Sequence, residues 1–175
     1  MSTRYETGNP EDAFIEAEAF YYASDTIMDK SREIPAMEYK RSFGPFYSAL
    51  VCHSFATEMY LKCLSLAGSQ KKFAVVHDLE FLFNELDKQM QDEIINNYNC
   101  KYYSFDEDCF DIAKKIKQKS LLELISESKL AFKLLRYGVT QDKLKPQYRL
   151  FWVTQSIRDI AINYVPESAD LLLLK

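Results

Sequence analysis

The sequence predicts an all-α fold, an up-and-down antiparallel helical bundle. Hydrophobic residues make up 47% of its 175 residues and only four are glycine, a composition that favours long helices over many short strands. Apolar residues recur at three- and four-residue spacing in several segments, as on the buried face of a helix. We expect no strands, and a single domain over residues 1–175 with its core at about 10–165.

Two long helices should open the chain. The first is expected to begin at Asn9-Pro10, where proline and acidic residues suit a helix N-terminus, and to end near Arg32. After a polar connection over 33–42, Gly44-Pro45 should open a second helix that Gly68-Ser69 ends. Two opposite faces of this second helix are apolar, so it should lie at the centre of the bundle.

Three further helical segments complete the expected bundle. Asp78 is a candidate N-cap for a third helix that 96–99 should close. The pattern from Asp108 to Leu135 is helical again, either continuous or broken near Ser120, and a last helix should run from about Pro146 to Tyr164. The inward positions of the third and last helices are Leu79, Leu82, Phe83, Leu86, Met90, Ile94, Leu150, Val153, Ile157, Ile160 and Ala161.

The apolar C-terminal tail, residues 166–175, carries four consecutive leucines from 171 to 174. Burying a leucine side chain is worth roughly 1.5 to 3 kcal/mol, so we expect this tail to dock on the bundle or on a second subunit.

The sequence predicts a cytoplasmic protein without a membrane segment. No secretory signal follows Met1, and acidic or basic residues interrupt every apolar run before it reaches the roughly 20 residues of a membrane helix. Cys52 and Cys63 should lie about 16 Å apart along one helix, too far for a disulfide or a shared metal. Cys100 and Cys109 flank a loop and belong to no Cys/His cluster. Buried or incidental thiols are therefore expected, and no metal or cofactor.

Charge is distributed unevenly along the chain. Residues 76–111 carry ten acids and two bases, whereas residues 112–149 carry ten bases and three acids. The basic stretch either attracts an anionic partner such as RNA, or pairs with the acidic stretch within one bundle or across a dimer.

One segment resembles a known family. Glu58-Met59-Tyr60-Leu61-Lys62, followed by His77-Asp78-Leu79-Glu80-Phe81-Leu82, is similar to the HEPN family (higher eukaryotes and prokaryotes nucleotide-binding). Leu135-Arg136-Tyr137-Gly138 also looks like the Arg-Tyr pair that members carry ahead of the last helix. The resemblance implies a small helical bundle, and many members are ribonucleases in defence and toxin–antitoxin systems. The partners it implies are a second copy of the chain, a cognate antitoxin or a nucleotidyltransferase-like protein.

Two groups of residues are the candidate ligand-binding site. Glu58 and Lys62 are spaced as an intrahelical ion pair, and His77 is either a structural hydrogen-bonding residue or a general acid–base. Arg136 and Tyr137, with Lys133 one turn earlier, suit a phosphate and a base, although Arg136 suits the Glu58 carboxylate equally well.

The ribonuclease motif of the family is missing. That motif is an arginine, four to six residues, then a histidine, and no arginine here is followed by a histidine at that distance. His53 lies among aliphatic positions, so we expect a core histidine whose ring nitrogens are hydrogen-bonded. We therefore expect a non-catalytic protein that binds RNA, a nucleotide or a partner protein. The alternatives are a metal-independent endoribonuclease with a rearranged site using His77, Arg136 and Tyr137, and a pure protein-interaction module.

Overall fold

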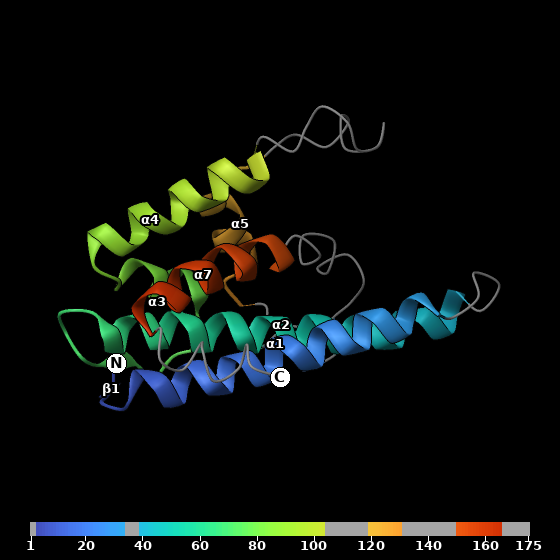
Figure 1. The fold of residues 1–175 in the computed structure, drawn as a ribbon, viewed down its shortest axis with the longest axis horizontal. Coiled ribbons are helices and arrows are strands. Elements are labelled where there is room, and N and C mark those ends of the chain that lie inside the picture. Colours follow the sequence, from blue (N-terminus) through green and yellow to red (C-terminus); the bar gives the residue numbers. More distant parts are fainter. Residues whose placement is uncertain (1–2, 34–38, 104–118, 131–149, 166–175) are drawn as a thin grey trace.

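The computed structural model describes residues 3–33, 39–103, 119–130 and 150–165. This described part is mostly helical, which confirms the all-α expectation at that level (Figure 1). The predicted C-terminal tail and much of the basic stretch 112–149 lie outside the described residues.

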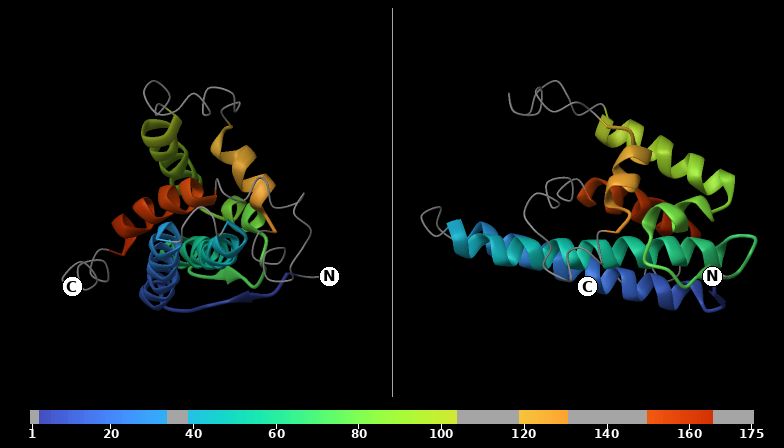
Figure 2. Two further views of the ribbon diagram at one scale, coloured as in Figure 1. Left: turned by 90° about the vertical axis from the view of Figure 1, so that its right-hand side faces the viewer. Right: turned by 180° about the vertical axis from the view of Figure 1, so that it is seen from behind.

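The two longest helices form an antiparallel pair. Helix α1 spans Pro10–Arg32, as the sequence predicted, and α2 spans Tyr39–Ala67. They lie side by side over most of their lengths (Figure 2). The predicted start of α2 was wrong: the helix begins before Gly44-Pro45 and contains Pro45 in its second turn. At this position proline removes the hydrogen bond that its N–H would donate, and its ring crowds the carbonyl four residues earlier.

Helix α2 is the central element. Every side chain from 60 to 66 is buried, so α2 is covered on all sides there, as its two apolar faces predicted. It ends where the Gly68 amide donates to the Leu64 carbonyl at 2.9 Å.

Two very short strands correct the expectation of no β-structure. Strand β1 (Tyr5–Glu6) pairs antiparallel with β2 (Phe73–Ala74), with Tyr5 opposite Ala74. Each strand has two residues, too few for alternation to be visible in the sequence. The pair ties the N-terminal segment to the loop that follows α2.

The predicted third helix is divided in two. Helix α3 spans Leu79–Asn84 and α4 spans Lys88–Tyr98, continuing into a π-helical turn, η2, at Asn99–Tyr103. Asp78 caps α3 as predicted, since its side chain accepts a hydrogen bond from the Phe81 amide at 3.0 Å. All six inward positions predicted for this segment are buried, so the break preserves the apolar face.

The last described helices are α5 (Leu121–Ser128) and α7 (Leu150–Tyr164). Residues 119 and 120 are not helical, so the described chain breaks near Ser120, which forms a capping box with Glu123. All five inward positions predicted for the last helix are buried in α7.

Helix α7 lies between α2 and α4 (Figure 2). Helix α7 runs in the same direction as α2. The His53 ring packs against Phe151, and about one turn further along both helices the hydroxyls of Thr57 and Thr154 are hydrogen-bonded. None of the described helices combines the length and apolarity needed to cross a bilayer.

Candidate functional site

The structure brings three of the predicted site residues together. The Lys62 ammonium lies 2.6 Å from Glu58 Oε1, one helical turn away on α2. His77, in the loop between β2 and α3, places Nδ1 3.1 Å from Oε1 and 3.0 Å from Oε2 of the same carboxylate. The predicted ion pair of Glu58 and Lys62 is therefore present, and His77 completes a three-residue cluster that we call the Glu58 cluster.

The members of the Glu58 cluster differ in burial. The Glu58 side chain is 1% exposed, Lys62 is 10% exposed, and His77 is 60% exposed. A buried carboxylate is tolerated when cations or donors satisfy its oxygens, and here Lys62 and His77 do so. An ionised carboxylate can only accept hydrogen bonds, so Nδ1 of His77 carries a proton. The cluster thus fixes the tautomer and orientation of an exposed imidazole.

Further contacts lie on either side of the β2–α3 loop, at β2 and at the start of α3. The Lys62 ammonium lies 5.3 Å from the centre of the Phe73 ring, within the range of a cation–π interaction. The Leu79 amide donates to the Lys129 carbonyl at 2.9 Å, joining the start of α3 to the end of α5. The His-Asp-Leu segment therefore orders this corner of the fold, as its structural interpretation predicted.

The second group of predicted site residues, Arg136, Tyr137 and Lys133, lies outside the described residues. Two lysines of the basic stretch are described. Lys119 pairs with Glu127, and Lys129 Nζ lies 3.3 Å from Glu80, a residue of the acidic stretch 76–111. Both described lysines thus pair with acids of the same chain, but of the two only Lys129 pairs with the acidic stretch, because Glu127 belongs to the basic stretch itself.

A buried ionic cluster that sequence reasoning missed joins α1, α2 and α7. The Arg158 guanidinium donates from Nε to Glu18 Oε1 at 2.6 Å and from Nη2 to Oε2 at 2.9 Å. Tyr60 donates its hydroxyl to the same Oε1 at 2.5 Å. Burial, reinforced by the charge of Glu18, raises the pKa of Tyr60 far above its usual value, so the hydroxyl keeps its proton.

The signal for this cluster was present in the sequence. Glu18 lies on the apolar stripe of α1, one turn from Phe14 and one turn from Tyr21. A charged residue on a buried face needs an oppositely charged or hydrogen-bonding partner. The sequence does not show that this partner is Arg158, 140 positions away.

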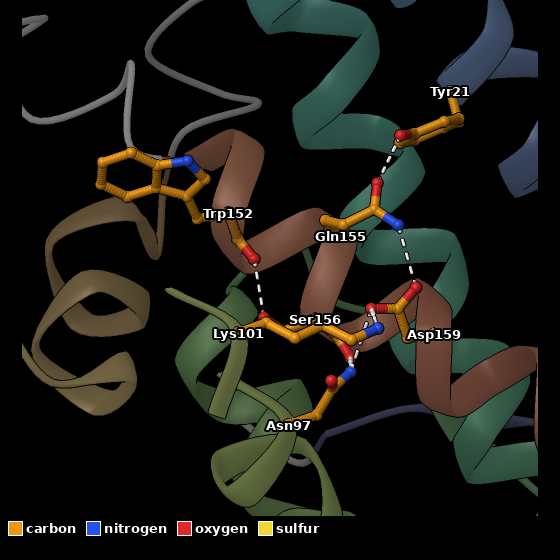
Figure 3. A network of polar contacts seen from close by, with 7 residues as sticks. All are labelled: Tyr21, Asn97, Lys101, Trp152, Gln155, Ser156 and Asp159. Carbon is orange, nitrogen blue, oxygen red and sulfur yellow. Dashed lines mark hydrogen bonds and ion pairs between the residues drawn. The ribbon is translucent and has the colours of Figure 1, made fainter. Parts of the chain in front are cut away.

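A polar network extends from this cluster toward α4 (Figure 3). The Tyr21 hydroxyl donates to Gln155 Oε1 at 2.5 Å, and the Gln155 amide donates to Asp159 Oδ1 at 2.9 Å. The other oxygen of Asp159 accepts from Lys101 at 2.9 Å and from Asn97 at 3.1 Å. Figure 3 shows Gln155 between Tyr21 and Asp159, with Trp152 directed away from them. Burial raises the pKa of Tyr21 to about 12, so this hydroxyl remains a donor.

His53 is buried, as predicted, but none of the described residues provides the hydrogen bonds that we expected for it. Neither ring nitrogen has a hydrogen-bond partner among the described residues, and the nearest carboxylate oxygen, Asp25 Oδ1, is 4.0 Å from Nε2. The ring is packed edge-on against Phe151 and Tyr21. Burial lowers the pKa of His53 to about 4, so the imidazole is neutral at pH 7.

The described cysteines differ in exposure. Cys63 is buried, Cys52 is half-buried and Cys100 is exposed, while Cys109 lies outside the described residues. Burial raises the pKa of the Cys63 thiol to about 12, which leaves it inert at neutral pH. Within the described ranges, no three His, Cys, Asp or Glu side chains gather as metal ligands would.

Comparison of the chain with protein-family models, with curated proteins and with solved structures finds no match. The HEPN resemblance therefore rests on two short motifs, Glu58-x-x-Leu61-Lys62 and His77-Asp78-Leu79, and on the Arg136-Tyr137 pair.

Proposed function

We propose that this chain is a non-catalytic, HEPN-like helical bundle that binds RNA or a nucleotide, acting as a cytoplasmic homodimer in a defence, stress or toxin–antitoxin setting. The HEPN resemblance implies a further partner besides the second copy of the chain, either a cognate antitoxin or a nucleotidyltransferase-like protein. The observation that carries the proposal is the Glu58 cluster, whose ionisable groups engage one another within one protomer.

The geometry of the Glu58 cluster suits a structural role better than acid–base catalysis. A general base must reach the proton that it removes, and the Glu58 carboxylate is both buried and occupied by Lys62 and His77. His77 is exposed, but one of its nitrogens is committed to Glu58. Together with the missing Arg–His motif, this supports binding without hydrolysis.

The proposed ligand-binding residues are Arg136, Tyr137, Lys133, Lys62, Glu58 and His77, of which the last three form the Glu58 cluster. An arginine fork beside an aromatic ring can hold a phosphate and stack on a base. The ten bases of residues 112–149 would add the electrostatic attraction that nucleic-acid binding requires.

The test is binding of the purified protein to labelled single-stranded RNA over a salt series, with cleavage read on the same gel. We expect binding that weakens steeply with salt and no cleavage. Arg136→Ala should weaken binding and reduce the slope of log affinity against log salt by about one. Lys88→Ala is the matched control, because Lys88 is an exposed base on α4 that pairs with Asp92 at 2.8 Å.

Cleavage that disappears in His77→Ala would overturn the proposal in favour of a rearranged endoribonuclease. The orientation of an exposed imidazole by a buried carboxylate is the observation that favours this outcome.

A protein-interaction module is the second candidate function. The pairing of Lys129 with Glu80 and of Lys119 with Glu127 favours it, because both described lysines of the basic stretch are already neutralised. An oligomer that persists at high salt, without RNA affinity, would support this candidate over the first.

A further inference from the structure

The β2–α3 loop, residues 75–78, carries His77 and is fixed at both of its ends. At its start the Val75 amide donates to the Arg4 carbonyl at 2.9 Å, next to β1. At its end Asp78 caps α3. The imidazole is therefore placed by backbone contacts on both sides of it in the chain.

Strand β1 supplies the contacts at the start of this loop. Tyr5 and Glu6 pair with the two residues of β2, so β1 lies along the strand that leads into the loop. The Tyr5 ring lies 4.7 Å from the ammonium of Lys72, the residue before β2. The Tyr5 hydroxyl donates at 2.7 Å to Glu85, the C-cap of α3. Tyr5 thus contacts the chain both before and after the segment that carries His77.

Strand β2 also touches the Glu58 cluster directly. The Phe73 ring lies 5.3 Å from the Lys62 ammonium, which is 2.6 Å from the Glu58 carboxylate. Phe73 is the residue of β2 that pairs with Glu6. A displacement of β1 would therefore reach the cluster by two routes, through Phe73 to Lys62 and along the chain to His77.

We propose that β1 is a positioning strand for His77, keeping its imidazole on the Glu58 carboxylate with the proton on Nδ1. The inference rests on the proposed function, since it takes His77 as a ligand-binding residue. A neutral imidazole has one N–H, and the hydrogen bond that one nitrogen makes decides which nitrogen carries it. With Nδ1 donating to the carboxylate, Nε2 is the nitrogen that can accept a hydrogen bond from a ligand. An imidazole released from Glu58 would exchange between both tautomers.

The test is ¹⁵N NMR of the imidazole nitrogens in the full chain, at a pH where the rings are neutral. Tyr5→Ala removes both side-chain contacts of β1, and Glu6→Pro removes the N–H of a paired residue. We expect both variants to lose the Nδ1-protonated signature that His77 shows in the wild type. Tyr22→Ala removes a tyrosine of similar exposure from α1, and this matched control should keep the signature. The chain has two histidines, so His77→Gln assigns the signals.

A conservative variant separates the two contacts of Tyr5. Tyr5→Phe keeps the ring beside Lys72 and loses only the hydrogen bond to Glu85, so it should retain more of the signature than Tyr5→Ala. An unchanged signature in both Tyr5→Ala and Glu6→Pro would overturn the inference, because the cap of α3 would then suffice to hold the loop. So would its loss in Tyr22→Ala, since the cause would then be a general loosening of the fold.

Binding of labelled single-stranded RNA distinguishes this inference from the proposed function. Tyr5→Ala should weaken RNA binding as much as His77→Ala does, and Tyr22→Ala should bind as the wild type does. If the wild type binds no RNA, the proposed function fails, and the tautomer comparison still decides whether β1 positions His77.

Discussion

Glu18 on α1 and Arg158 on α7 are joined by two hydrogen bonds, although they are 140 residues apart in the sequence. Tyr60 of α2 donates to the same carboxylate, so one buried group connects three helices. The bidentate geometry satisfies both oxygens of Glu18 and orients the guanidinium over the Tyr21 ring.

We predict that Glu18→Gln lowers the free energy of unfolding by about 3 kcal/mol, because it leaves the largely buried Arg158 without a counter-charge. Urea denaturation at pH 7 measures the change. Asp92→Asn is the control, since Asp92 forms an exposed pair with Lys88 that should contribute less than about 0.5 kcal/mol. A Glu18→Gln variant as stable as this control would show that the buried pair contributes little.

The Glu58 cluster should respond differently to loss of its buried and exposed members. Glu58→Gln leaves the buried Lys62 ammonium unpaired and should cost about 3 kcal/mol or more of unfolding free energy. His77→Ala removes a mostly exposed partner and should cost less than about 1 kcal/mol. Thermal and urea unfolding of the two variants measure this order, and the reverse order would contradict the assignment of Glu58 as the centre of the cluster.

The lowered pKa of His53 predicts acid sensitivity. Its value of about 4 in the folded chain lies below the ordinary 6.5, so between these pH values the unfolded chain binds more protons. The stability contributed by neutral His53 is therefore complete above pH 6.5 and is lost as the pH falls toward 4. The shift corresponds to about 3 kcal/mol. His53→Phe should flatten this part of the curve of unfolding free energy against pH, and an unchanged curve would contradict the prediction.

Periodicity was enough to predict the main helices and their buried faces. The bounds of α1 and the buried positions of α3, α4 and α7 follow from apolar residues at helical spacing. Asp78 was identified from local chemistry, because a cap acts within one turn of its own residue. Glu58 and Lys62 were paired for the same reason, since i and i+4 side chains meet on any helix.

Features that depend on distant parts of the chain could not be predicted. Gly44-Pro45 has the local signature of a helix start, but α2 begins earlier. The break between α3 and α4 leaves the inward pattern intact, so periodicity does not reveal it. Contacts from His77 to Glu58 and from Arg158 to Glu18 cross between elements, and only the packing of those elements brings these residues together.

The end of α2 provides a test of close packing. Gly68 lies against Asp87, whose carboxylate accepts from the Ser69 amide at 2.8 Å and from the Ser69 hydroxyl at 2.7 Å. A Cβ on Gly68 would lie 2.9 Å from Asp87 Oδ2 and 3.2 Å from the Leu64 carbonyl oxygen. Because the Ser69 bonds hold this carboxylate in place, Gly68→Ala should lower the free energy of unfolding by about 1 to 3 kcal/mol.

Gly8→Ala is the matched control for this substitution. A Cβ there would make ordinary contacts at 3.6 Å with Leu66 and 4.0 Å with Phe73, so we expect a change within about 0.5 kcal/mol. In an Asp87→Ala background the closer clash is gone, and Gly68→Ala should then cost less than it does in the wild type. Equal costs in the two backgrounds, measured by urea unfolding, would show that Asp87 is not the group that requires glycine at position 68.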